Sequence, residues 1–124
     1  MKNPLKRKSV QLWLEALRSG LYKQTRGQLR NEKGFCCLGV ACEVYNIQQR
    51  KNHKKQLQYE NFHYDEEYNT LPNKVKNWLG LTSEDGGYYR GSKLKSLVVK
   101  NDNGTSFNKI ADIIENNPKG LFVE

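Results

Sequence analysis

The sequence predicts a single α+β domain over residues 1–124, with about four helices packed on a small antiparallel hairpin sheet. Its length of 124 residues is that of one domain. Apolar residues recur at helical spacing in some segments, whereas other segments lack this period and contain glycines and turn residues. No repeat, low-complexity tract or linker divides the chain.

The first helix is expected to begin at Ser9, whose hydroxyl suits an N-cap, and to end at Ser19–Gly20. An earlier start at Asn3–Pro4 stays open, because proline is tolerated at the first helical position. One apolar stripe at helical spacing supports this helix. It consists of Val10, Trp13, Leu14, Leu17 and Leu21.

A hairpin is expected next. Residues 22–30 have no helical stripe and predict a strand, with a bulge or close backbone approach at Gly27. Residues 31–34 have turn chemistry, and residues 35–37 predict the returning strand. The largely apolar run over residues 38–45 then predicts a buried central helix.

The middle of the chain is less informative. Residues 46–70 are polar, with a solvated basic stretch over residues 48–55 and a stretch compatible with an edge strand over residues 56–62. The pattern becomes clear again at Pro72, which opens a helix that ends at Gly80.

The last third predicts a loop, a short apolar element, a turn and a final helix. Residues 83–94 are rich in glycine and predict the loop, whereas residues 94–99 are ambiguous between strand and helix. Residues 101–104 have strong turn chemistry. Ser106 is expected to cap the last helix, and Phe122 to dock the C-terminal segment on the core.

Positive charge is concentrated in the first half of the chain. The net charge is +8, with +10 in residues 1–55 and −2 in residues 56–124. A basic segment favours a polyanionic partner, although a solvated basic face would have the same composition. No apolar run approaches the ~20 residues of a membrane span, and the basic N-terminus lacks the pattern of a signal peptide.

Three cysteines, Cys36, Cys37 and Cys42, are too few and too clustered for a disulfide framework, so a reducing cytoplasm is expected. Cys36 or Cys37 at a strand–helix junction could be a nucleophile, but this needs a base. The two histidines, His53 and His63, lie in no recognisable motif, so small buried side chains are the favoured interpretation. The spacing also matches no zinc motif, and no metal or cofactor is expected.

The main binding hypothesis is a pocket for an anionic, nucleotide-like ligand. On the expected strand, Gln24, Arg26 and Arg30 would share one face, where arginine suits bidentate phosphate contact. The glycine-rich loop adds rings and a guanidinium for base stacking, and a polar pair near residue 101 is placed to contact a ribose. The candidate residues are Gln24, Thr25, Arg26, Arg30, Tyr88, Tyr89, Arg90, Asn101 and Asp102.

A nucleic acid is the alternative partner, because basic side chains could line a surface that follows a phosphate backbone. No helix-turn-helix, zinc-finger, basic-zipper or RNA-binding signature accompanies them. The candidate residues are Lys2, Lys6, Arg7, Lys8, Arg18, Lys23, Arg26 and Arg30, extended by Lys51, Lys54 and Lys55.

Two motifs carry a resemblance to known proteins. They are Trp-x2-Ala-Leu-Arg-Ser-Gly over residues 13–20 and Gly-Phe-Cys-Cys-Leu-Gly-Val over residues 34–40, with further similar pieces in residues 22–30, 71–81 and 106–115. This combination resembles a group of small proteins from bacteriophages and prophages. The resemblance implies a phage accessory protein that acts in the cytoplasm of the host cell, and it says nothing about catalysis.

Together these observations predict a phage accessory protein with an anti-defence role, which binds and sequesters an anionic host molecule such as a nucleotide-derived immune signal. A DNA- or RNA-binding phage protein is the first alternative, and a small cysteine-dependent hydrolase or phosphodiesterase is the second. Self-association into a homo-oligomer is expected, since it would help a small chain to enclose a pocket. A host protein stays open as a further partner.

Overall fold

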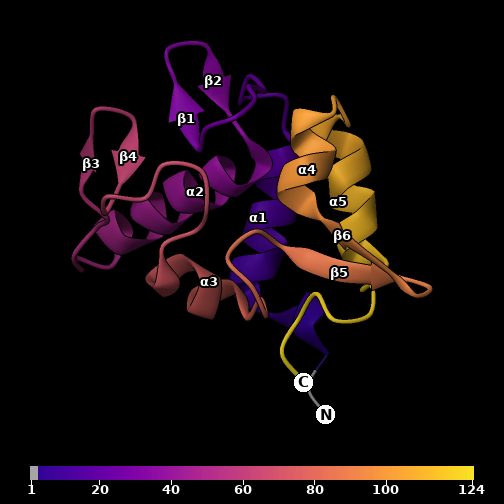
Figure 1. Ribbon diagram of the computed structural model, residues 1–124. Coiled ribbons are helices and arrows are strands. Elements are labelled where there is room, and N and C mark those ends of the chain that lie inside the picture. Colours follow the sequence, from indigo (N-terminus) through magenta and orange to yellow (C-terminus); the bar gives the residue numbers. More distant parts are fainter. Residues whose placement is uncertain (1–2) are drawn as a thin grey trace.

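The computed structural model describes residues 3–124 and confirms the α+β class (Figure 1). Within these residues there are five α-helices, and the strands form three separate two-stranded antiparallel ribbons rather than one sheet. Figure 1 shows the ribbons at the periphery of the helices. No helix in this part of the chain has the length and apolar character needed to cross a membrane.

Helix α1 spans Lys8–Arg18 and stops before Gly20, which has the left-handed φ of +76° expected at a helix end. The expected N-cap at Ser9 is wrong, because the cap position is Arg7. Ser9 is buried, and its hydroxyl donates a hydrogen bond to the carbonyl of Trp78 at 2.7 Å. The side chains of α1 that enter the core are Val10, Trp13, Leu14 and Leu17.

The residues on either side of α1 differ from the predictions made for them. A 3₁₀ turn at Pro4–Lys6 precedes the helix, and Asn3 Oδ1 accepts the Leu5 N–H at 3.0 Å, so the early start is a separate turn. Leu21 was expected in the apolar stripe but lies beyond the helix end with 84% of its surface exposed.

The predicted strand over residues 22–30 is wrong. Only Arg30–Asn31 (β1) pairs with Gly34–Phe35 (β2), and residues 21–29 form an irregular segment with one isolated bridge at Gln24. A segment without a periodic pattern must find its hydrogen-bond partners in tertiary structure. In this protein the partners include the backbone of Phe35 and Tyr68 and the side chains of Asn101 and Asp102.

Helix α2 spans Cys37–Lys51 and is longer at both ends than the run over residues 38–45 predicts. It begins directly after β2, so the expected returning strand ends at Phe35 and Cys36 becomes the N-cap. As predicted, α2 is the buried central helix, and α1 and the β1–β2 ribbon pack against it (Figure 1).

The polar middle of the chain folds into a second ribbon and a helix. Tyr59–Glu60 (β3) pairs with His63–Tyr64 (β4), so part of the stretch compatible with an edge strand is indeed extended. Helix α3 spans Asn73–Leu79, with Pro72 one position earlier than expected, at the N-cap. The predicted helix end at Gly80 is confirmed by its left-handed φ of +79°.

The predicted glycine-rich loop over residues 83–94 is wrong, because it contains most of a hairpin. Gly87–Arg90 (β5) pairs with Lys93–Ser96 (β6), and the glycine at position 91 lies in the turn between them. Its φ of +64° is one that a tight hairpin turn requires.

The ambiguous residues 94–99 belong to two elements. They finish β6 and then begin helix α4, which spans Leu97–Asp102 with the Ser96 hydroxyl accepting the Val99 N–H at 3.2 Å. The expected turn over residues 101–104 therefore begins too early, since residues 101 and 102 are helical. Turn chemistry applies only to the two residues that follow.

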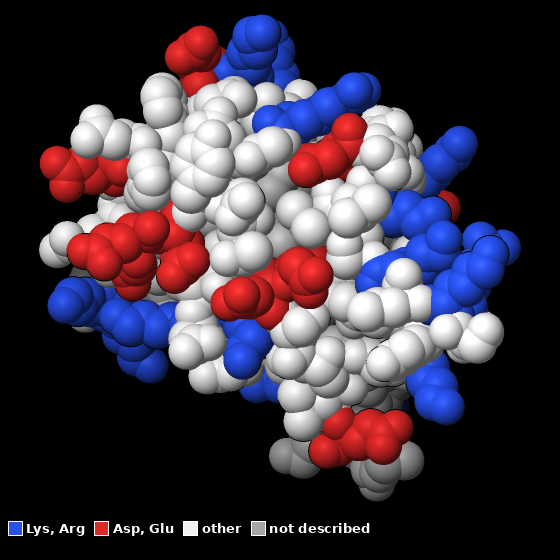
Figure 2. Space-filling model, viewed as in Figure 1, with Lys and Arg blue, Asp and Glu red and all other residues white. Residues whose placement is uncertain are grey.

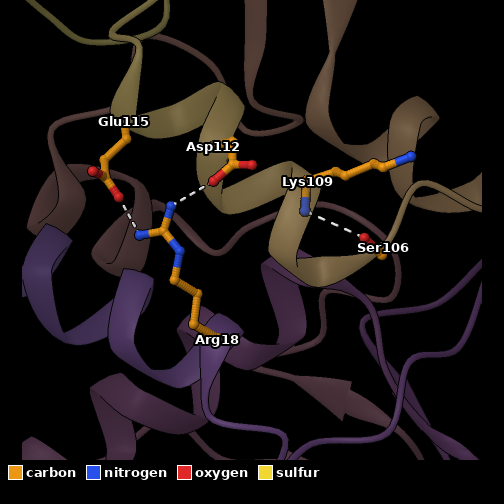
Figure 3. Close-up of polar contacts among 5 residues, drawn as sticks. All are labelled: Arg18, Ser106, Lys109, Asp112 and Glu115. Atoms are coloured by element: carbon orange, nitrogen blue, oxygen red, sulfur yellow. Dashed lines mark hydrogen bonds and ion pairs between the residues drawn. The ribbon is translucent and has the colours of Figure 1, made fainter.

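Helix α5 spans Phe107–Glu115, and the predicted cap at Ser106 is confirmed by its acceptance of the Lys109 N–H at 3.3 Å. Figure 3 shows how α5 is tied to α1: the Arg18 guanidinium lies between Asp112 and Glu115 and donates to both carboxylates. The Arg18–Asp112 distance is 2.7 Å. This exposed pair adds to the apolar contact between the two helices.

The C-terminal segment docks as predicted. Phe122 is buried and forms an isolated bridge with Leu81, and the Val123 N–H donates to the carbonyl of Gly80 at 2.8 Å. One hydrophobic core joins all five helices and the inner residues of the ribbons.

Candidate functional site

One buried side chain organises the segment that the sequence marks as a ligand-binding region. Asn101 is fully buried on α4, and its Oδ1 accepts the Gln24 amide at 2.9 Å and the Cys37 N–H at 3.1 Å. Its Nδ2 donates to the carbonyl of Thr25 at 2.8 Å. Asn101 therefore fastens residues 24–25 to the start of α2, and these bonds use its amide within the protein.

The neighbouring carboxylate has a similar role. Asp102 Oδ1 accepts the Gly27 N–H at 3.0 Å. The Arg26 side chain reaches across to Gly104, where a Cβ would lie 3.0 Å from its guanidinium. Both residues predicted to contact a ribose thus shape the wall that holds Arg26.

The Gly-Phe-Cys-Cys-Leu-Gly-Val motif fixes the same wall from the other side. The Cys36 N–H donates to the carbonyl of Leu29 at 3.0 Å, and its sulfur accepts the Gly39 N–H at 3.4 Å. A Cβ on Gly39 would lie 1.7 Å from the Leu29 carbonyl oxygen, so α2 packs directly on that backbone. The motif therefore allows α2 to pack closely against the backbone at Leu29.

The outer surface of this clamped segment is a groove of about 550 Å³. Three of the nine predicted site residues line it, and they are joined by residues of the β1–β2 turn and by one ring from the β3–β4 turn. The lining residues, called the anion groove from here on, are Gln24, Thr25, Arg26, Gln28, Asn31, Glu32, Lys33 and Phe62.

The charges of the anion groove favour an anion. Arg26 and Lys33 are exposed, and neither is within ion-pair distance of a carboxylate in residues 3–124. Glu32 is the single acidic side chain among the lining residues. Two available cations against one carboxylate leave the groove positive.

An exposed ring forms one wall of the groove. Phe62 is 37% exposed and lies with Asn61 in the β3–β4 turn, at φ values of +66° and +50°. Such a turn favours glycine at the second position, and a bulky residue at positive φ costs about 1–3 kcal/mol. The fold therefore retains an exposed ring at a strained position.

Arg30 does not line the groove with Gln24 and Arg26, contrary to the predicted shared strand face. Its guanidinium carbon lies 4.8 Å from the centre of the Phe35 ring and 4.5 Å from that of Tyr59, and Nη1 donates to the Tyr64 hydroxyl at 3.3 Å. These contacts join the β1–β2 ribbon to the β3–β4 ribbon.

The predicted stacking residues also lie apart from the groove. Tyr88 is only 4% exposed because its ring packs into the core. Tyr89 and Arg90 are exposed on β5, and Tyr89 lines a different cavity. The sequence therefore suggested a single site where the structure has two surfaces.

The sequence analysis missed five of the groove residues, which are Gln28, Asn31, Glu32, Lys33 and Phe62; Lys33 and Phe62 are the two that add a cation and a ring. Lys33 lies in a turn that was interpreted only as a connection, and Phe62 lies in the stretch compatible with an edge strand. The signal for Phe62 is the Asn61–Phe62 pair, in which phenylalanine stands where hairpin turns favour glycine.

The three cysteines are buried at the start of α2. Burial raises the pKa of the Cys36 thiol to about 11, and burial raises the pKa of Cys37 and Cys42 well above the usual value. All three thiols are therefore protonated near neutral pH, which argues against a cysteine nucleophile. Within residues 3–124, no three His, Cys, Asp or Glu side chains are grouped to hold a metal ion.

We expect the native protein to react slowly with iodoacetamide near neutral pH, with the rate increasing as the pH approaches the raised pKa of Cys36. Mass spectrometry of the alkylated protein measures this, and unfolding in guanidinium should expose all three thiols. Rapid labelling of one thiol in the folded protein would support a cysteine-dependent enzyme instead.

The basic residues proposed to bind nucleic acid are not all free to contact a phosphate backbone. Lys2 lies outside the described residues, and Arg18 is held by Asp112 and Glu115 (Figure 3). Figure 2 shows basic and acidic side chains on the same face, with the basic ones gathered mainly toward the β5–β6 ribbon and below α2. The difference in charge between the two halves of the sequence therefore does not appear as one basic and one acidic face in this view.

These features define a small α+β protein with a positively charged, ring-walled groove held in place by a buried asparagine. The chain belongs to the family described as a domain of unknown function (DUF8296), whose model matches residues 1–118. Comparison with curated proteins and with solved structures gives no match.

Proposed function

We propose that this protein binds a small anionic ligand of the nucleotide class in the anion groove and sequesters it. The observation that supports this most directly is that Arg26, Lys33 and the exposed Phe62 ring line one groove of about 550 Å³. Arginine binds phosphate through two parallel hydrogen bonds, and a ring can stack on a base. The amides of the other lining residues can orient polar groups of the ligand.

The biological setting follows from the resemblance to phage and prophage proteins. A phage accessory protein in the host cytoplasm would remove a nucleotide-derived immune signal by tight binding, which requires no catalytic group. The predicted homo-oligomer stays a prediction, which native mass spectrometry of the purified protein can test together with retention of a ligand.

The test uses AMP, ADP-ribose, a cyclic dinucleotide and inorganic phosphate as probes in calorimetric titrations. At least one nucleotide is expected to bind more tightly than phosphate alone, because the ring adds stacking to the charge contact. Arg26→Ala should lower its affinity by about 10–100-fold, and Phe62→Ala by about 10-fold.

Arg90→Ala is the matched control, since it removes the same charge from an exposed side chain outside the groove. It should leave affinity within about twofold of the unsubstituted protein. Failure of every nucleotide to bind, or an equal loss in Arg90→Ala and Arg26→Ala, would refute a nucleotide site in this groove.

Salt dependence separates this proposal from the nucleic-acid alternative. A groove ligand with one or two phosphates should show a shallow dependence of log affinity on log salt, whereas a protein that covers many phosphates loses about 10³–10⁵ in affinity between low and moderate salt. Tighter and steeply salt-dependent binding of oligothymidylate would favour the polynucleotide.

A further inference from the structure

A second surface, on the β5–β6 ribbon, is apolar although it faces solvent. Tyr89 and Leu94 are cross-strand partners, and they share the ribbon face with Gly87 and Ser96. The opposite face carries Tyr88, which is buried. The ribbon is therefore attached to the core by one face and presents the other face outward.

This outward face forms one side of a cavity of about 590 Å³, with α4 on the other side. The exposed fractions of its three largest apolar side chains are 69% for Leu94, 54% for Val99 and 46% for Tyr89. The small residues Gly87 and Ser96 line the cavity between them. Solvent-exposed apolar side chains that converge on one hollow are typical of an interaction site.

The charge around the cavity is positive. Lys95 and Lys100 line it, and Asp85 is the one carboxylate among its lining residues. Lys119 accepts the Tyr89 N–H through its backbone carbonyl at 2.7 Å, which places Lys119 beside β5. Figure 2 shows the basic side chains gathered around this ribbon.

We propose that this cavity docks an acidic segment of a partner protein, which inserts an apolar side chain between Leu94, Val99 and Tyr89 and places carboxylates against the surrounding lysines. Two of the three large apolar side chains, Leu94 and Val99, are aliphatic and do not stack on bases, so the surface fits a protein better than a nucleic acid. A second copy is disfavoured, because a symmetric pair would oppose the same positive patch on both copies.

The test is a titration of ¹⁵N-labelled protein with a synthetic peptide that has leucines at i, i+3, i+4 and i+7 and glutamates elsewhere. The expected result is a set of amide shifts that includes Leu94, Val99 and Lys100. Two matched peptides, one with lysine for every glutamate and one with alanine for every leucine, should bind at least about 10-fold more weakly.

Substitutions in the protein test whether the acidic peptide binds in this cavity. Val99→Glu and Leu94→Glu should each weaken the acidic peptide by about 10-fold or more, because they put a like charge into the apolar hollow. Leu21→Glu is the control, since Leu21 is 84% exposed and lies outside the cavity. Circular dichroism shows whether each variant keeps the fold.

The proposal fails if the acidic peptide does not bind at roughly millimolar concentration, or if the lysine peptide binds equally well. It also fails if Val99→Glu instead abolishes self-association, or if oligothymidylate perturbs the same amides more strongly. Arg26→Ala should leave peptide binding unchanged, so this inference and the nucleotide proposal can fail separately.

Discussion

Replacement of Asn101 by alanine is expected to lower the free energy of unfolding by about 2–4 kcal/mol, because it leaves buried polar groups without partners. The Cys37 N–H and the Thr25 carbonyl would lose their bonds to the Asn101 amide, and Gln24 would lose one of its two acceptors. Urea unfolding followed by circular dichroism measures the change.

Asn103→Ala is the matched control, because Asn103 is the same residue type just after α4 but is exposed. Its substitution should change the free energy of unfolding by less than about 0.5 kcal/mol. Equal stability of the two variants would contradict the role assigned to Asn101. If Asn101→Ala binds the nucleotide more weakly under conditions in which the variant stays folded, the displaced groove wall would be the cause.

Replacement of Gly39 by alanine is expected to cost about 3 kcal/mol or more, since the added methyl group cannot fit without moving α2. The new Cβ would lie 1.7 Å from the carbonyl oxygen of Leu29 and 2.6 Å from its carbonyl carbon, both of which are backbone atoms. Thermal unfolding and the urea midpoint give the measurement.

Gly20→Ala separates the steric clash from a change in backbone preference. Gly20 has a φ of +76° and no atom within 4 Å of an added Cβ, so its substitution should cost only about 1–2 kcal/mol. If Gly39→Ala were as mild as Gly20→Ala, α2 would not be packed against Leu29 as described.

The elements that the sequence predicts well are those whose signal is local. Helices α1 and α5 have apolar stripes at helical spacing and clear ends, so their existence and buried faces could be predicted. The segment over residues 21–29 has no such period. Its conformation depends on bonds such as that of Gln24 to Asn101, which is 77 residues away, and no local pattern reports such a contact.

Residues 101–104 show how tertiary contacts override local preference. Asparagine, aspartate and glycine in succession favour a turn, yet Ser96 starts a helix that continues through Asp102. The Asn101 amide, which could have bonded to its own backbone, bonds instead to Gln24, Thr25 and Cys37.

The candidate site was predictable in part for the same reason. Residue type marked Gln24, Thr25 and Arg26 as polar and cationic groups suited to an anion, and they do line one groove. Lys33 and Phe62 join them only because two hairpin turns meet in space. The sequence does not encode that proximity in any spacing rule.

Helix α4 has only six residues, yet it touches both of the surfaces proposed to bind ligands. Asn101 and Asp102 hold the wall of the anion groove, and Val99 and Lys100 line the cavity on the β5–β6 ribbon. A rigid element shared by two sites is a route for linkage, and linkage between two bound states is reciprocal. To whatever extent a docked protein segment strengthens or weakens ligand retention, the ligand must change the affinity for that segment by the same factor.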